Sequence, residues 1–198
     1  MPDTGESRAA PALALMSGSL RAASLNTSVL RAAARIITDA TSGQVRVITV
    51  DIGGMPHFNA DLDAGALPAV NRFLASLAQA DGLLIATPEY NGYPSGALKN
   101  ALDWATRDAA DGPLSGLPTS TVSASPGERG GSFAQRHLRE MLRRCGAVVV
   151  GDPVAISRAS AAVSADGEFT DPGTCARIAD AAMTLLTVCL DRRQAVPR

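Results

Sequence analysis

Short apolar runs alternate with longer amphipathic stretches along most of the chain. The apolar runs have the length and β-branched content of strands, whereas the longer stretches space their apolar residues as one helical face. The predicted strands are Ala12–Ser17, Val45–Val50, Gly82–Thr87, Thr119–Ala124 and Ala147–Val150, and a resumption of the last strand at Val154–Ile156 is left open. The predicted helices are Asn26–Ala40, Leu67–Gln79, Gly96–Arg107, Ser132–Arg144 and Thr174–Leu190.

Fully apolar strands separated by amphipathic helices are typical of a parallel sheet with both faces covered. Because crossovers are short and right-handed, five such units predict a doubly wound, three-layer α/β sandwich. No linker or internal repeat divides the chain, so we expect one domain over residues 11–192, after a disordered polar tail at residues 1–10. A long loop is predicted at residues 51–65.

Charge, hydropathy and cysteine content exclude several classes of function. The chain has 198 residues and a formal net charge of −1 at pH 7, which argues against nucleic acid as a partner because phosphate backbones need a basic face. No apolar run approaches the roughly 18 residues that cross a bilayer, so no membrane partner is expected. Three cysteines without a C-x-x-C pair and two isolated histidines predict neither disulfides nor a metal site, and they favour a cytoplasmic location.

Ligands of doubly wound sheets bind beyond the carboxyl ends of the strands, which directs attention to three loops. The first loop, residues 18–28, opens a predicted helix whose free N–H groups and dipole suit a phosphate. Hydroxyl donors and Arg21 could complete such a site, although an ordinary helix cap at Ser24 or Asn26 with a solvated arginine is an open alternative. The loop matches neither an NTPase P-loop nor the G-x-G-x-x-G fingerprint.

The second loop, residues 88–96, contains two tyrosines and precedes Trp104 on the next predicted helix. A flat aromatic ligand could stack on such side chains. We expect Tyr90 to serve a ligand because it follows the strand end directly, and Trp104 to be helix core. The third loop, residues 123–132, is rich in glycine, which permits close approach of a backbone to a ligand.

Two of these loops resemble the motifs of the NADPH-dependent FMN reductase family, which has the flavodoxin-like fold. The residues that carry the resemblance are Gly18-Ser19-Leu20-Arg21, Ser24-Leu25-Asn26, Pro88-Glu89-Tyr90-Asn91, Leu98-Lys99-Asn100 and Asp103-Trp104. The similarity extends over about residues 12–190 and implies a five-stranded sheet of order 2-1-3-4-5.

The resemblance also implies a site. The FMN phosphate would be held by Ser19, Arg21, Ser24, Asn26 and Thr27. The isoalloxazine ring and ribityl chain would be bordered, largely through backbone, by Pro88, Glu89, Tyr90 and Asn91, with Ser125, Gly127 and Gly131 closing the third side. NAD(P)H would reduce the flavin, and a quinone, free flavin or similar small acceptor would then oxidise it in a ping-pong cycle.

The cofactor would supply that chemistry, so we name no catalytic side chain. Relatives are commonly dimers or tetramers, which implies a homodimer or homotetramer. A flavodoxin-type electron carrier without its own NAD(P)H activity is the main alternative, although such carriers have strongly acidic surfaces and this chain does not. A hydrolase is disfavoured because the chain has no G-x-S-x-G elbow. The choice between NADH and NADPH is left open.

Overall fold

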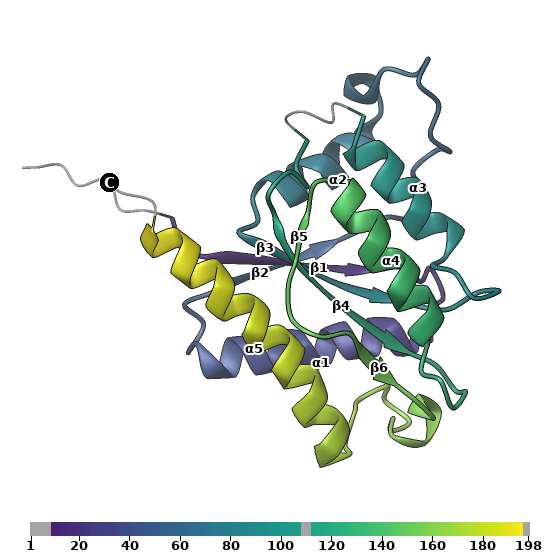
Figure 1. Ribbon diagram of the computed structural model, residues 1–198, viewed down its shortest axis with the longest axis vertical. Helices are drawn as coiled ribbons and strands as arrows, with labels where there is room; N and C mark the ends of the chain where they lie inside the picture. Colours follow the sequence, from purple (N-terminus) through teal and green to yellow (C-terminus); the bar gives the residue numbers. More distant parts are fainter. Residues whose placement is uncertain (1–8, 108–111, 196–198) are drawn as a thin grey trace, which may run out of the picture.

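The strands pair in parallel in the computed structural model, which describes residues 9–107 and 112–195 (Figure 1). The strands are β1 (Ala12–Ser17), β2 (Arg46–Val50), β3 (Gly82–Thr87), β4 (Pro118–Ala124), β5 (Val148–Val149) and β6 (Val154–Ile156). Their order is β2-β1-β3-β4-β5, with β6 also paired to β4. The predicted parallel α/β sheet and its strand order are therefore confirmed.

The fifth position of the sheet is filled by two short strands. β5 pairs with the start of β4 and β6 with its end. Between them Gly151 has a φ of 62°, and its carbonyl accepts a hydrogen bond of 2.6 Å from the Arg139 guanidinium. The strand predicted at Ala147–Val150 is thus shorter than expected. The chain does resume the strand at Val154–Ile156, a possibility that the sequence had left open.

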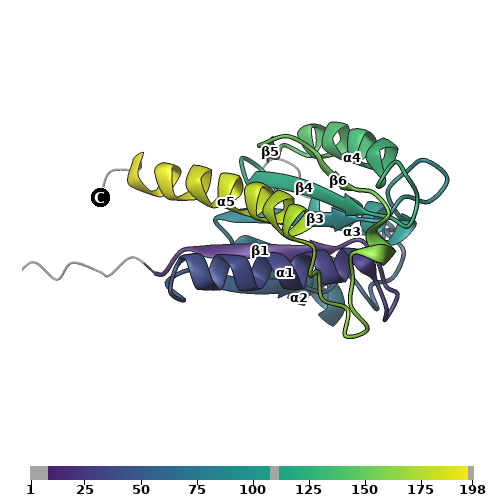
Figure 2. The ribbon, with the colours of Figure 1, turned by 90° about the horizontal axis from the view of Figure 1, so that it is seen from below.

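Helices cover both faces of the sheet. α1 (Leu25–Ala40) and α5 (Pro172–Ala195) lie side by side over one face (Figure 2), and α2 (Pro68–Ala78), α3 (Gly96–Ala105) and α4 (Ser132–Arg144) cover the other. The strands alternate accordingly: Leu13 and Leu15 face α1 and α5, whereas Ala14 and Met16 face the other three helices. Two short 3₁₀ helices, η1 (Ala64–Ala66) and η2 (Ala159–Ala161), lie in the connections.

The last helix, α5, packs one face against α1 and the sheet and is also held by an ion pair near its C-terminal end. It has the length and the mean hydropathy, 1.3, of a membrane span, yet Ile178, Ala182 and Leu185 pack against α1 and the sheet. Near its end Arg193 pairs with Asp81, and it also donates to the Ala9 carbonyl. α5 therefore behaves as a core helix and runs past residue 192 to Ala195. Of the predicted tail, residues 1–8 lie outside the described residues.

A close contact between β3 and α5 involves a cysteine and a glycine. Cys189 is only 1% exposed, and burial, reinforced by nearby Asp81, raises the pKa of its thiol to about 12. The thiol is therefore protonated and acts as a small apolar core group. A Cβ on Gly82 would overlap the Cys189 sulfur and lie 3.1 Å from Leu185 Cδ1 and 3.2 Å from Leu13 Cδ2.

We expect Gly82→Ala to lower the free energy of unfolding by roughly 1–3 kcal/mol, the scale of core overpacking, in urea denaturation. Adding Cys189→Ala should recover part of this loss because it removes the overlapping sulfur. Gly96→Ala is the matched control: a Cβ there meets no atom within 4 Å, so stability should be unchanged or increased. An unchanged midpoint and slope for Gly82→Ala would contradict this packing.

Candidate active site

The three loops singled out by the sequence meet at one edge of the sheet. β1, β3 and β4 are neighbours that run in the same direction, so Ser17, Thr87 and Ala124 end side by side (Figure 1). This edge is where doubly wound sheets bind ligands. The loop after β2, residues 51–65, leaves the sheet at the same edge.

The first loop places hydroxyl groups around the start of α1. Ser24 is the N-cap, and its Oγ accepts the Thr27 N–H at 3.2 Å. The Thr27 hydroxyl is 2.9 Å from that of Ser17, and Ser19 Oγ accepts the Arg21 N–H at 3.4 Å. Arg21 is exposed and forms no ion pair with any described residue. The helix cap of the alternative interpretation is thus present at Ser24, and it leaves Arg21 exposed and available to an anion.

Asn26 joins the first loop to the third. Its Nδ2 donates to the Ala124 carbonyl at 3.1 Å, and its Oδ1 accepts the Ala124 N–H at 2.9 Å. The residue is 3% exposed. Because both ends of the amide bind Ala124, the side chain is held between the two loops, and the Asn26 backbone N–H lies in the first turn of α1, where a phosphate would bind. The structure thus gives the side chain a positioning role that the sequence did not reveal.

Ser95, which the sequence analysis did not select, joins the first loop to the second. Its Oγ donates to the Gly18 carbonyl at 2.5 Å and accepts the Leu98 N–H at 3.1 Å as the N-cap of α3. The Gly18 N–H in turn donates to Ala86 at the end of β3. A serine directly before a predicted helix is the sequence signal that identifies such a cap.

Glu89 joins the second loop to the third. Its Oε2 accepts the N–H groups of Phe133 and Ala134, each at 3.0 Å, in the first turn of α4. The residue before this helix, Gly131, has a φ of 87° and no capping side chain. A carboxylate from the neighbouring loop therefore caps α4, and the Glu89 side chain is directed toward the helix.

A tight turn presents the two tyrosines of the second loop. The backbone N–H groups of Tyr90 and Tyr93 donate to each other's carbonyls at 2.9 and 3.0 Å, and Asn91 and Gly92 both have positive φ. Tyr90 is 47% and Tyr93 58% exposed, and the Tyr93 ring stacks on His137 of α4 with centroids 4.3 Å apart. The turn therefore offers an aromatic surface to a ligand.

The loop at residues 51–65 is fixed by residues of the second motif. Asn100 accepts the Phe58 N–H at 2.7 Å and donates to the Pro56 carbonyl at 2.9 Å. Trp104 Nε1 donates to the same carbonyl at 2.9 Å, and its ring, 1% exposed, contacts that of Phe58 edge-on. Trp104 is confirmed as helix core, and the motif is found to hold a fourth loop at the site.

The third loop is attached to β6 and η2. The Ser125 N–H donates to Ile156 at 3.1 Å, and the exposed Gly127 accepts from the Arg158 N–H at 3.0 Å. A Cβ on Gly130 would lie 2.8 Å from the Ala155 carbonyl carbon, so the close approach of these segments requires glycine.

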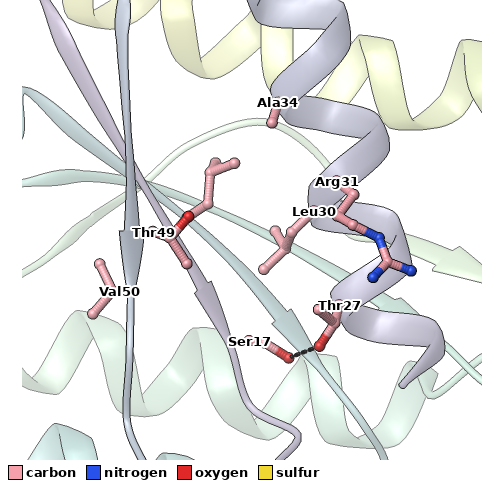
Figure 3. A pocket seen from close by; sticks show the side chains of 8 residues that line it. Ser17, Thr27, Leu30, Arg31, Ala34, Thr49 and Val50 are labelled. Atoms are coloured by element: carbon pink, nitrogen blue, oxygen red, sulfur yellow. Dashed lines mark hydrogen bonds between the residues drawn. The ribbon is translucent and has the colours of Figure 1, made fainter. Parts of the chain in front are cut away.

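A pocket of about 410 Å³ of empty space, open to solvent, lies between α1 and β2 (Figure 3). Ser17 and Thr27 lie at the end of this pocket that is near the first loop, and apolar side chains such as Leu30 and Ala34 line the rest. The pocket adjoins the start of α1 but follows the helix flank away from the second and third loops. We therefore place the candidate site at the loops.

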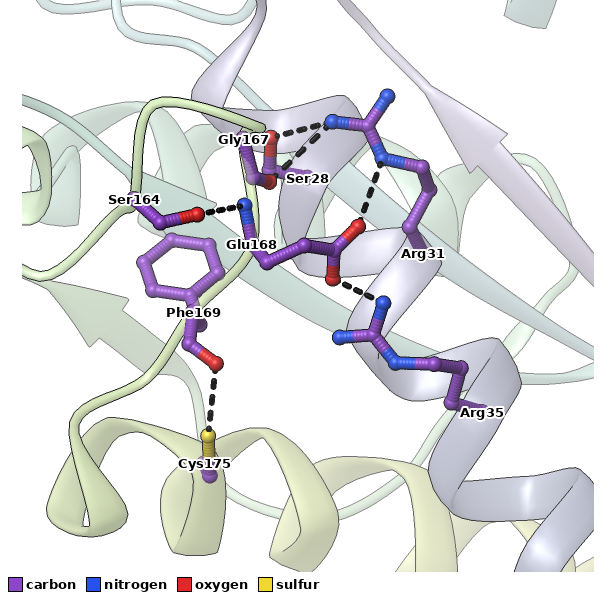
Figure 4. Close-up of polar contacts among 8 residues, drawn as sticks. All are labelled: Ser28, Arg31, Arg35, Ser164, Gly167, Glu168, Phe169 and Cys175. Atoms are coloured by element: carbon purple, nitrogen blue, oxygen red, sulfur yellow. Dashed lines mark hydrogen bonds and ion pairs between the residues drawn. The ribbon is translucent and has the colours of Figure 1, made fainter.

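Arg31 borders this pocket but is occupied by contacts elsewhere. Its guanidinium donates to Ser28 at 2.9 Å and to the Gly167 carbonyl at 3.2 Å (Figure 4). Glu168 pairs with both Arg31 and Arg35, and these contacts hold the turn before α5 against α1. Arg31 is thus neutralised within the fold, in contrast to Arg21.

The donor set at the start of α1 suits a phosphate monoester. Helix N–H groups, the hydroxyls of Ser19 and Thr27, and the exposed Arg21, which forms no ion pair with any described residue, all belong to residues 19–28 at this edge. Each is a donor to an oxyanion, and the helix dipole adds to their attraction. The residues present therefore fit the phosphate end of FMN.

Comparison with known proteins decides the family. The model of the NADPH-dependent FMN reductase family matches residues 11–161. The chain belongs to this family. It is 41% identical over 158 residues to an NAD(P)H-dependent FMN reductase of Pseudomonas aeruginosa, covering 79% of this chain and 83% of the relative. It is 35% identical over 163 residues to a 2-hydroxy-1,4-benzoquinone reductase of a Burkholderia species, covering 82% and 87%.

Comparison with solved structures supports the same family and fold. The flavoenzyme NAD(P)H:(acceptor) oxidoreductase FerB of Paracoccus denitrificans superposes with a TM-score of 0.81 at 32% identity, over 91% of this chain and 98% of that one. A short-chain flavodoxin, at 14% identity and a TM-score of 0.57, shares the fold. The chain is an FMN-dependent NAD(P)H oxidoreductase with a flavodoxin-like fold, as the resemblance implied.

Replacing Asn26 with alanine should lower the free energy of unfolding by about 1–3 kcal/mol, because it leaves two buried polar groups of Ala124 without partners. FMN affinity should fall with it, since the first and third loops lose their connection. Chemical denaturation and FMN titration measure both effects. Asn71→Ala, which removes an exposed amide bonded to Gly65, is the control and should change stability by less than about 0.5 kcal/mol. Equal effects of the two substitutions would contradict the positioning role of Asn26.

Proposed function

We propose that FMN binds with its phosphate at the start of α1. Ser19, Arg21 and Thr27 would contact the phosphate through their side chains, and Asn26 through its backbone N–H. Ser24 would support the site as the cap that holds the first turn open to the ligand. The single observation that carries the proposal is an exposed, unpaired arginine next to a capped helix N-terminus at the carboxyl edge of the sheet.

We further propose that the isoalloxazine ring lies against the second and third loops. Pro88 is buried and Tyr90 exposed, so the loop offers a rigid floor and an aromatic edge. The backbones of Glu89 and Asn91 would border the ring on one side. Ser125, Gly127 and Gly131 would border it on the other. The capping of α4 by Glu89 holds these two borders at a fixed separation.

The protein's part in the reaction is binding, orientation and access. FMN, when bound, supplies the hydride chemistry. The exposed rings of Tyr90 and Tyr93 would pack against flat substrates that enter above it. One such entrance, used first by NAD(P)H and then by the acceptor, gives a ping-pong cycle.

Quinones are the proposed acceptors. The relatives include the 2-hydroxy-1,4-benzoquinone reductase above and a quinone reductase of Pseudomonas putida that is 37% identical over 131 residues. A quinone is flat and apolar, which suits the aromatic rim of the second loop. Free flavin has the same shape and is the second candidate.

We propose a cytoplasmic homodimer or homotetramer that binds neither nucleic acid nor membrane. The cysteines are free thiols, which suits a reducing compartment. Leu20 is a large apolar side chain, 63% exposed, near the site edge, and a second subunit would shield it.

The decisive experiment combines spectroscopy and turnover. The purified protein, supplied with FMN, should show the visible flavin band, and that band should bleach when NADPH or NADH is added without oxygen. Adding a benzoquinone should restore the band and consume nucleotide in equal amounts. An electron carrier of the flavodoxin kind would bind FMN yet resist reduction until a partner reductase is added. Failure to bind FMN at all would rule out both readings.

Arg21→Ala should weaken FMN binding by roughly 10- to 150-fold, which corresponds to about 1.5–3 kcal/mol for a charged hydrogen bond. Fluorescence titration of the apoprotein with FMN measures this effect. Riboflavin, which lacks the phosphate, should bind the variant and the parent equally. Arg143→Ala, an arginine in the last turn of α4, is the control with an expected change near zero. If Arg21→Ala left FMN affinity intact, Arg21 would not belong to the phosphate site.

A further inference from the structure

Two arginines contact one phenylalanine ring beside the site edge. The Arg129 guanidinium carbon lies 5.1 Å and that of Arg136 5.7 Å from the centre of the Phe133 ring. Phe133 is 38% exposed, and both arginines are exposed. We call these three residues the Arg129–Phe133–Arg136 cluster. It spans the third loop and the first turns of α4.

Neither arginine of the cluster forms an ion pair with any described residue. Other arginines nearby do: Arg158 pairs with Glu128 and Arg144 with Glu140. Glu89, the carboxylate at this end of α4, is taken up by two backbone N–H groups. Two like charges beside one ring repel each other, and the positive end of the helix dipole adds to that repulsion. Binding of an anion would relieve it.

The geometry prepares the two guanidinium groups for a phosphate. A guanidinium over an aromatic ring uses its face for the cation–π contact and keeps its N–H edges free. Those edges are the donors that bind phosphate oxygens in pairs. The shared ring also fixes the two groups relative to each other, so less side-chain entropy is lost when a ligand binds.

The cluster lies next to the proposed flavin site. Phe133, its central residue, donates its backbone N–H to Glu89 in the loop that we propose borders the isoalloxazine ring. A pyridine nucleotide whose nicotinamide stacks on that ring must extend its adenosine half beyond the rim. A phosphate monoester carries close to two negative charges, which matches two unpaired arginines. NADPH carries such a monoester at its 2′ position, and NADH does not.

We propose that the Arg129–Phe133–Arg136 cluster binds the 2′-phosphate of NADPH and makes the enzyme prefer NADPH to NADH. This inference rests on the proposed function, since it concerns the reductant of the same site. It assigns a task to two arginine side chains that neither hold the flavin nor connect the loops.

Equilibrium binding tests the assignment without turnover. The FMN-loaded protein is titrated calorimetrically with NADP⁺ and with NAD⁺, which differ only by the 2′-phosphate. The parent should bind NADP⁺ more tightly. In Arg129→Gln/Arg136→Gln, affinity for NADP⁺ should fall by about tenfold or more, the scale of lost charged hydrogen bonds, while that for NAD⁺ is unchanged. The KM for NADPH should rise in parallel, with the KM for NADH unaffected.

Arg143→Gln is the matched control, since it removes the same charge from the other end of α4 and should alter neither affinity. An equal loss for NADP⁺ and NAD⁺ in the double variant would assign the cluster to the pyrophosphate and overturn the proposal. Unchanged NADP⁺ affinity would also overturn it. If neither nucleotide reduces the parent flavin, the proposed function fails, and the NADP⁺ titration still judges the cluster separately.

Discussion

Three side-chain contacts fasten the site loops to one another, and the geometry of the carboxyl edge depends on them. Asn26 connects the first loop to the third through both hydrogen bonds to Ala124. Ser95 connects the first to the second through Gly18, and Glu89 connects the second to the third through the start of α4. The three loops therefore form a closed set in which each is held by the other two. Loops without such contacts would be the mobile parts of the fold.

In this arrangement, the residues that hold the loops in place differ from those that we propose to contact the ligand. Asn26, Glu89 and Ser95 use their polar groups inside the protein, whereas Arg21 and Tyr90 are exposed. A flavin brings its own reactivity, so the chain needs a rigid frame more than an acid–base pair. Buried polar contacts suit that task because they specify one arrangement and are costly to break.

Periodicity was enough to predict most of the fold. The strands at 12–17 and 82–87 have the observed boundaries, and the parallel order follows from apolar strands alternating with amphipathic helices. The sequence left open whether the last strand resumes at Val154–Ile156, because the Arg139 contact with Gly151 that accompanies its division is tertiary. Likewise, the side-chain task of Asn26 depends on a partner 98 positions away. A motif shows that a residue is needed at a site, but its partner decides whether it binds a ligand or holds a loop.

Three arginines at the site edge have no acidic partner within the described part of the chain. The whole chain is nearly neutral at −1, yet Arg21, Arg129 and Arg136, on the loops and helix at one edge, form no ion pair with any described residue. Two arginines on the face of α1 and α5 are instead neutralised within the fold, Arg31 by Glu168 and Arg193 by Asp81. The exposed positive charge of these three arginines attracts anions to this edge. A cofactor and a co-substrate that both carry phosphates are the ligands that benefit from such a field.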